Sequence, residues 1–255
     1  EIGVLSSIAT ATVVLACVVG SALLGMFIRA RLPDHHLSPE TKDSVKLAMG
    51  LVATMVALIL GLLIASAKSS FDAERNGVAQ MAAKIVFLDR MLVDYGPETT
   101  EARQLLRHSV ARAIAEMWPD RKSAQSQLDP TATPADGLYA LIQQLSPKTE
   151  LQRVLKSQTM GIAFDLGQLR WLEFEQSGGS VSMPILIIMT SWLAILFVSF
   201  GLFSPPNGTV VASLLLVALS VSAAIFLIME LDRPFDGAIQ ISSEPLDNAL
   251  AHLHK

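Results

Sequence analysis

The sequence has little cysteine and little charge, and each shortage limits what the protein can be. A single cysteine among 255 residues, Cys17, excludes an intramolecular disulfide framework and a multi-cysteine zinc or iron–sulfur site. The 19 Lys and Arg against 23 Asp and Glu give a net charge of -4, so the chain lacks the basic surplus of nucleic-acid-binding proteins. DNA and RNA are therefore not expected as partners.

Charged residues make up only 16% of the chain and hydrophobic residues 51%, which is too apolar for a soluble single-core domain. A helix needs about 20 apolar residues to cross a bilayer core about 30 Å thick. Uncharged runs of that length occur at residues 3–28, 47–67, 181–203 and 209–229. The first run lacks the basic start and the short apolar core of a secretory signal, so we interpret it as a retained helix. The chain is predicted to be a multi-pass protein with four transmembrane helices.

The four spans are expected to form two hairpins separated by a water-soluble insert. The last two spans are joined only by Ser-Pro-Pro-Asn-Gly at 204–208, a composition typical of a tight turn. The predicted fold is all-α, with a first transmembrane hairpin at 1–67, a helical insert at 68–180, a second hairpin at 181–230 and a C-terminal tail at 231–255.

Apolar residues of the insert recur at helical spacing throughout. The first stripe has no proline between it and the second span, which predicts one long helix that leaves the membrane and ends near Tyr95, before Gly96-Pro97. Its members are Phe71, Val78, Met81, Ile85, Leu88 and Leu92. Further helices are predicted at 98–118, 138–145 and 149–175, the last with an apolar face of Leu151, Val154, Leu155, Ile162, Leu166, Leu169 and Leu172.

Several segments carry a family resemblance, namely LGLLIASAKSSFD at 60–72, LDRMLVDYGPE at 88–98, FGLFSPPN at 200–207 and MELDRPFDG at 229–237. They resemble a bacterial family of four-span inner-membrane proteins described as having a bestrophin-like domain. The resemblance implies kinship with bestrophins, anion channels in which several four-span subunits surround one axial pore, lined chiefly by the second span. The calcium-binding run of acidic residues in bestrophins has no counterpart here, because Gly237 is followed by Ala-Ile-Gln-Ile.

The resemblance also implies partners and a location. It implies a homo-oligomer of four or more subunits, expected to be a pentamer, with inorganic ions and the lipid bilayer as the other partners. It places the chain in the bacterial inner (plasma) membrane with the termini and the insert in the cytoplasm. Basic residues near the span ends are almost equally divided between the two sides, so the positive-inside rule gives no orientation of its own.

The second span has a face of small residues at helical spacing, which we take as the candidate pore lining: Gly50, Thr54, Ala57, Gly61 and Ala65, followed by Lys68. An apolar neck can gate by dewetting, and charged rings at a mouth select ions, a role for which Asp72 is also a candidate. The alternative is close helix packing, since small residues four apart let transmembrane backbones approach. The sequence leaves both interpretations open.

Two acids close the fourth span. Glu230 and Asp232 lie where the helix macrodipole is negative, which is unfavourable for a carboxylate by roughly 0.3–1 kcal/mol. A compensating partner is therefore expected, with Arg233, Lys68 or Arg75 as structural candidates. A bound or permeating cation is the other interpretation, which would place both acids at a pore mouth or an ion-binding site.

Metal and catalytic sites are not expected. Adjacent histidines in Asp34-His35-His36 point apart in an extended chain and have no helical partner, so they do not form a metal site. His108, His252 and His254 are assigned to the solvated surface. No nucleophile elbow, phosphate loop or paired-carboxylate arrangement occurs, so we expect neither an enzyme nor a cofactor.

Two functional hypotheses remain. The first is an oligomeric ion channel with an axial pore lined mainly by the second span. The second is a non-conducting membrane scaffold or sensor whose cytosolic helices bind a protein partner, motivated by the size of the insert. A secondary transporter is disfavoured, because the spans contain no intramembrane acid and no proline-broken substrate helix.

Overall fold

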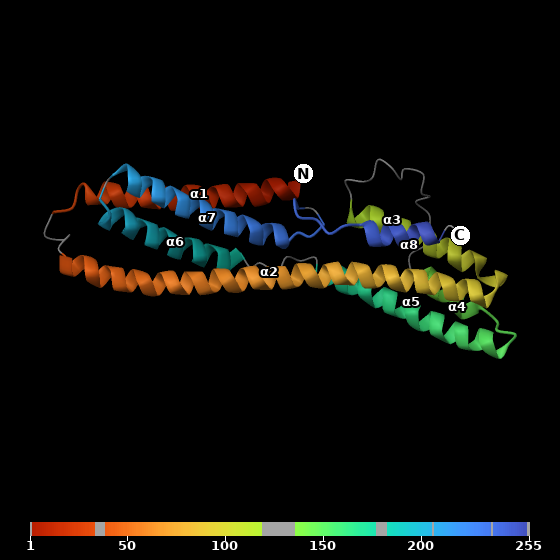
Figure 1. The fold of residues 1–255 in the computed structure, drawn as a ribbon. Coiled ribbons are helices and arrows are strands. Elements are labelled where there is room, and N and C mark those ends of the chain that lie inside the picture. The colour runs from red at the N-terminus through yellow and green to blue at the C-terminus, as the bar shows by residue number, and fades with distance from the viewer. Residues whose placement is uncertain are drawn as a thin grey trace. The chain divides into compact units, whose positions relative to one another are not determined.

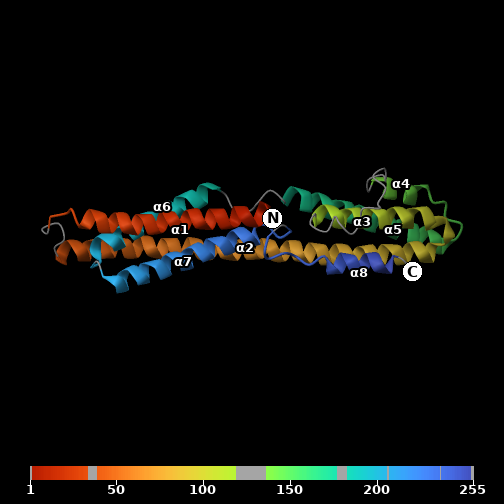
Figure 2. The same ribbon diagram turned by 90° about the horizontal axis from the view of Figure 1, so that it is seen from above.

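The structure is a computed structural model that describes residues 2–33, 39–118, 136–176, 183–205, 207–235 and 237–253. These residues form helices and turns, with no strand among them (Figures 1 and 2). The all-α prediction is confirmed. Two compact units are present: a membrane unit of Glu1–Phe71 and Gly179–Ile239, and an insert unit of Asp72–Gly178 and Gln240–Lys255. The long helix α2, Pro39–Tyr95, contributes to both.

The membrane unit contains α1 (Ile2–Arg29), the first part of α2, α6 (Met183–Phe203) and α7 (Gly208–Leu231). Each includes a stretch long and apolar enough to cross a membrane, in agreement with the four predicted spans. Helix α1 packs against α6 and α7. The core between them is formed by Val18, Val56, Met189, Leu193, Phe197, Ala218 and Ile225.

Helices α1 and α6 approach so closely that glycine is required on both. A Cβ atom added to Gly25 would overlap with the Val198 carbonyl oxygen, and one added to Gly201 would overlap with the Ala22 carbonyl oxygen. Both glycines are buried. In an apolar medium such close backbone contact supplies the dispersion energy that holds helices together. The sequence prediction did not single out either residue.

The ends of the membrane helices are capped by specific side chains. Arg29, at the end of α1, donates to the Ser204 carbonyl oxygen just beyond α6, where free carbonyl groups and the helix dipole favour a cation. The Asn207 side chain accepts a hydrogen bond of 2.9 Å from the Val210 amide and so caps the start of α7. Asn207 thus acts in the predicted tight turn as a helix cap.

The insert unit contains the end of α2, the 3-10 turn η2 (Pro97–Thr99), α3 (Thr100–Met117), α4 (Asp136–Gln144), α5 (Glu150–Gln176) and α8 (Glu244–His252). The predicted stripe along α2 is buried at all six positions, from Phe71 to Leu92. The predicted apolar face of α5 is only partly correct, because Leu151 and Val154 are exposed. A loop was predicted at 129–137, but its last two residues, Asp136 and Gly137, belong to α4. Residues 129–135 and the hinge predicted at 177–180 lie outside the described residues.

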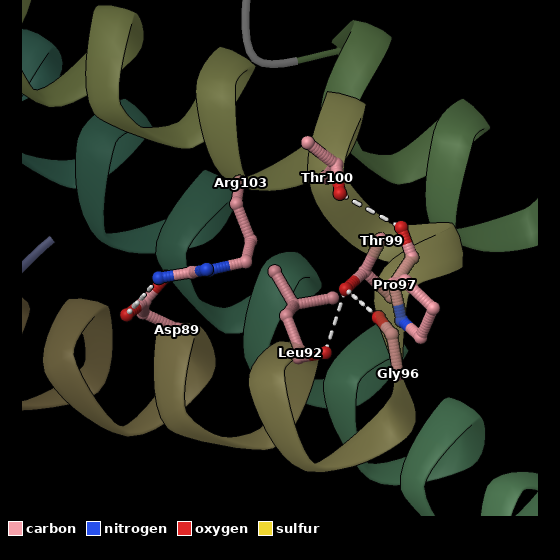
Figure 3. A network of polar contacts seen from close by, with 7 residues as sticks. All are labelled: Asp89, Leu92, Gly96, Pro97, Thr99, Thr100 and Arg103. Carbon is pink, nitrogen blue, oxygen red and sulfur yellow. Dashed lines mark hydrogen bonds and ion pairs between the residues drawn. The ribbon is translucent and has the colours of Figure 1, made fainter. Parts of the chain in front are cut away.

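A polar network fixes the corner between α2 and α3 (Figure 3). Gly96 has φ 132°, a conformation that side chains with a Cβ rarely adopt, and Pro97 follows it. The Thr99 hydroxyl lies 2.6 Å from the Leu92 carbonyl oxygen and 2.8 Å from that of Gly96. The single hydroxyl proton is shared between these two acceptors, of which the Leu92 carbonyl belongs to the last turn of α2, where helical partners are lacking.

One ion pair spans this corner. The Arg103 guanidinium donates to both carboxylate oxygens of Asp89, at 2.7 and 3.3 Å (Figure 3). The two side chains are 29% and 12% exposed, so water screens the pair only in part. Hydrogen bonding to Asp89 raises the pKa of Arg103. This planar, bidentate contact cannot be reproduced by lysine.

We therefore expect Arg103→Lys to lower the free energy of unfolding by about 1–3 kcal/mol, because one bidentate charge-assisted contact is lost. Arg112→Lys, in an exposed pair with Glu116, is the matched control and should change stability by less than about 0.5 kcal/mol. Denaturant titration of both variants measures the difference. Equal effects of the two substitutions would contradict a structural role for the corner pair.

The C-terminal tail ends in a helix that the sequence prediction missed. Helix α8 packs against α3, with Leu246, Ala249 and Leu253 buried. The Trp118 indole N–H donates to the Ile241 carbonyl oxygen at 2.9 Å, which holds the segment before α8 in place. The end of the segment predicted only as a C-terminal tail is thus part of the core of the insert unit.

Candidate functional site

The small-residue face of α2 is uncovered along its whole length. All six candidate pore-lining residues are exposed within the chain: Gly50, Thr54, Ala57, Gly61, Ala65 and Lys68. A Cβ atom added to Gly50 or Gly61 would meet no described atom within 4 Å. Close packing within the chain therefore does not explain these two glycines, and the packing alternative left open by the sequence applies to them only between chains.

The rest of the α2 span is also poorly covered by its own chain. Only 6% of its most apolar stretch is buried, against 22–33% for the other three spans. A second exposed stripe of Leu47, Leu51, Leu58 and Leu62 runs at helical spacing beside the small residues. Helix α2 therefore has two adjacent free faces, one of small residues and one of leucines, on the side away from buried Val56.

The small-residue face offers no free polar group before Lys68. The Thr54 hydroxyl donates to the Leu51 carbonyl oxygen of its own helix at 2.8 Å, so this position is apolar in character. Lys68 then places its ammonium 5.6 Å from the ring centroid of buried Phe71, within the range of a cation–π contact. An apolar stretch that ends at a positioned cation is the arrangement expected of a narrow neck and its mouth.

Asp72 lies one helical turn beyond Lys68. Its side chain is half-buried, and it is the first residue of the insert unit. The structure thus places Asp72 on α2 at helical spacing from Lys68. Its assignment to a pore mouth stays a prediction.

Glu230 is fully buried near the end of α7, with 0% of its surface exposed. Its Oε2 atom accepts a hydrogen bond from the Ala238 amide, while its Oε1 atom has no hydrogen-bond partner among the described residues. A Cβ atom added to Gly237 would lie 2.7 Å from Oε2, so the chain folds closely over the carboxylate. The donor supplied by the fold is a backbone amide eight residues downstream, a partner that no sequence signal indicates.

Asp232 differs from Glu230 in its surroundings. It caps α7, and its backbone N–H donates to carbonyl oxygens of the last turn, including that of Ile228 at 3.1 Å. Its side chain is half-buried. The two acids therefore occupy different environments, and the ion-binding role predicted for both stays a prediction.

Among the described residues, no group of three or more His, Cys, Asp or Glu side chains is arranged to hold a metal ion. His108 and His252 are exposed, as predicted from the sequence. The Asp34-His35-His36 segment and His254 lie outside the described residues.

Comparisons with known proteins identify the family. A crystal structure of a bacterial bestrophin homologue from Klebsiella pneumoniae, carrying one substitution, aligns with a TM-score of 0.68 and 16% identity over 95% of this chain and 97% of that one. A structure described only as a membrane protein aligns with a TM-score of 0.67 and 14% identity over 95% and 96%. Likeness at this identity shows a shared fold. No curated protein matches the chain.

The family model for the Bestrophin-like domain matches residues 16–246, which include the second half of the first span, the other three spans and every candidate site residue. The resemblance seen in the short motifs is confirmed. Together with the four apolar helices, it establishes a multi-pass, all-α membrane protein. The chain belongs to the Bestrophin-like domain family.

Proposed function

We propose that this protein is an oligomeric ion channel whose subunits surround an axial pore lined by the small-residue face of α2. The observation that carries the proposal is the lack of cover on α2, of which 6% is buried in its most apolar stretch. In a ring, the small residues would face the axis and the adjacent leucine stripe would face the neighbouring subunit or lipid. Both free faces of α2 then have a function.

The subunit number we propose comes from the need for an axial pore and from the family resemblance. A pore needs several copies of α2 around it, so we expect four or more subunits, and a pentamer from the family resemblance. The inner membrane of a bacterium, with the termini and the insert in the cytoplasm, is the location we propose on the same basis. The protein moves ions without a chemical step, so no enzyme activity is expected.

The native mass of the particle in a lipid nanodisc is the first test. A closed ring of four or more subunits is expected. A monomer or dimer would contradict the axial pore and favour the second hypothesis, a scaffold or sensor whose exposed helices bind another protein. Mass is measured before flux because a closed channel gives no current.

We expect Gly61→Phe to abolish ion flux, because a ring of phenylalanines would fill a neck lined by small residues. Gly20→Phe on α1 is the matched control, since Gly20 is also exposed, with no described atom within 4 Å of an added Cβ. Flux is measured with purified protein in liposomes at equal assembled mass. Wild-type flux in Gly61→Phe would remove this face of α2 from the ion pathway.

A further inference from the structure

One arginine just beyond the end of α1 lies against an aromatic ring. The guanidinium carbon of Arg31 is 4.6 Å from the centre of the Phe27 ring, within the range of a cation–π contact. Both side chains are exposed. Arg103 and Arg112 of the insert unit each pair with a carboxylate, whereas Arg31 pairs with none among the described residues. The described part of the chain thus holds this cation on a ring and supplies no anion for it.

The side of α1 that leads to Arg31 is apolar and uncovered. We define the α1 face as Leu23, Leu24 and Phe27, whose side chains are between 51% and 56% exposed. Together with Arg31 these residues lie at helical spacing, so all four are on one side of the helix. Another side of α1 packs against α6 and α7. Residues 2–28 contain no charged residue. The α1 face is therefore an apolar strip with a single cation at its end.

The depth of Arg31 in the bilayer can be inferred from the length of the span. The apolar stretch of α1, Ser7–Arg29, has 23 residues and is about 35 Å long, whereas a bilayer core is about 30 Å thick. Arg31 lies two residues beyond this stretch, at the depth of the lipid headgroups. Figure 1 shows α1 at the edge of the membrane unit, with α6 and α7 between it and α2. Acyl chains therefore meet the α1 face, and headgroups meet Arg31.

We propose that Arg31 binds the phosphate of an anionic phospholipid whose acyl chain lies along the α1 face. A guanidinium donates two parallel hydrogen bonds to phosphate oxygens, and the contact with Phe27 keeps this guanidinium on the side of the acyl chains. A zwitterionic lipid carries its own ammonium group, which competes with Arg31 for the phosphate. A lipid with net negative charge, such as phosphatidylglycerol, is therefore preferred. The site is separate from the pore proposed on α2, and its test requires no ion flux.

Lipid binding to the purified particle tests the role of the charge. Native mass spectrometry of the delipidated protein in detergent counts bound lipids as phosphatidylglycerol or phosphatidylcholine is added. One basic residue at an anionic membrane surface contributes a factor of about five in affinity, which corresponds to ~1 kcal/mol. We therefore expect Arg31→Gln to weaken the binding of phosphatidylglycerol about fivefold and to leave the binding of phosphatidylcholine unchanged.

Arg107→Gln is the matched control, because it removes the same charge from the exposed surface of α3 in the insert unit. It should bind both lipids as the wild-type protein does. Equal affinity for phosphatidylglycerol in the wild-type protein and Arg31→Gln would overturn the site. Equal losses in Arg31→Gln and Arg107→Gln would also overturn it, since they would show an effect of total charge alone.

Photocrosslinking from the α1 face shows which molecule covers it. Leu24 is replaced by a photoreactive benzophenone amino acid, and the particle is placed in nanodiscs with equal amounts of the two lipids. After irradiation, we expect an adduct with the mass of phosphatidylglycerol, and a yield about fivefold lower when Arg31→Gln is added. Equal adducts of the two lipids would contradict the preference for an anionic lipid. A crosslink between two chains in place of a lipid adduct would make a neighbouring subunit the occupant and overturn the proposal.

Discussion

Gly25→Ala should destabilise the membrane unit, although alanine is the better helix former. The added methyl group overlaps with the backbone of α6 at Val198, so the two helices must separate or the substituted residue must strain, at a cost of about 1–3 kcal/mol. Weaker packing between α1 and α6 also exposes the core formed by Val18 and Phe197. The free energy of unfolding can be measured by titrating the purified protein from mild detergent into a denaturing one.

Gly20→Ala is the control for this experiment, and its effect should have the opposite sign. Gly20 lies on the same helix with open space around it, so alanine adds helix propensity of up to about 1 kcal/mol without a clash. The two substitutions change the composition of α1 identically. A loss of stability in both variants, or in neither, would show that the close approach of α1 and α6 does not limit stability.

Glu230→Ala should detach residues 237–239 from the end of α7, whereas Glu230→Gln should keep them attached. Alanine leaves the Ala238 amide without its acceptor, and the loss of a hydrogen bond to a carboxylate costs about 1.5–3 kcal/mol. Glutamine keeps an acceptor oxygen in place and removes a carboxylate that is buried with only one of its oxygens hydrogen-bonded. Hydrogen exchange at residues 237–239, together with the unfolding free energy, separates the two variants.

The opposite ranking would have a definite meaning. If Glu230→Gln were more damaging than Glu230→Ala, the negative charge itself would be required, as it is for a bound cation. Reversal potentials of Glu230→Gln channels would then decide whether that cation permeates. Identical potentials would leave Glu230 a structural group.

The spans could be predicted from sequence because their signal is local. A run such as 209–229 needs no knowledge of its neighbours, since length and composition alone suit it to the bilayer. The buried stripe of α2 from Phe71 to Leu92 could be predicted in the same way. Helical spacing places those side chains on one side of the helix, whichever element packs against it. Helix α8 was missed because it is only nine residues long and depends on packing against α3.

The glycines show that a sequence pattern does not predict which residue contacts another helix. Gly20 and Gly25 lie in the same apolar run, and nothing near them in sequence tells which one meets another helix. Gly50 and Gly61 were noticed because they recur in a stripe, yet their surroundings in the chain are open. The partner of Glu230 was unpredictable for a related reason, since it depends on how the backbone turns after α7.

The close approach of α1 and α6 also affects how the protein is made. Arg29 and Ser204, which bind one another beside Gly25 and Gly201, are 175 residues apart in the chain. At a synthesis rate of about 5–20 residues per second, roughly 10–35 seconds pass between the synthesis of α1 and that of α6. During that interval the surface around Gly25 is open to lipid or to the insertion machinery. The first helix is thus a long-lived intermediate in biosynthesis, and ribosome-bound chains that end before α6 would retain it in this unpaired state.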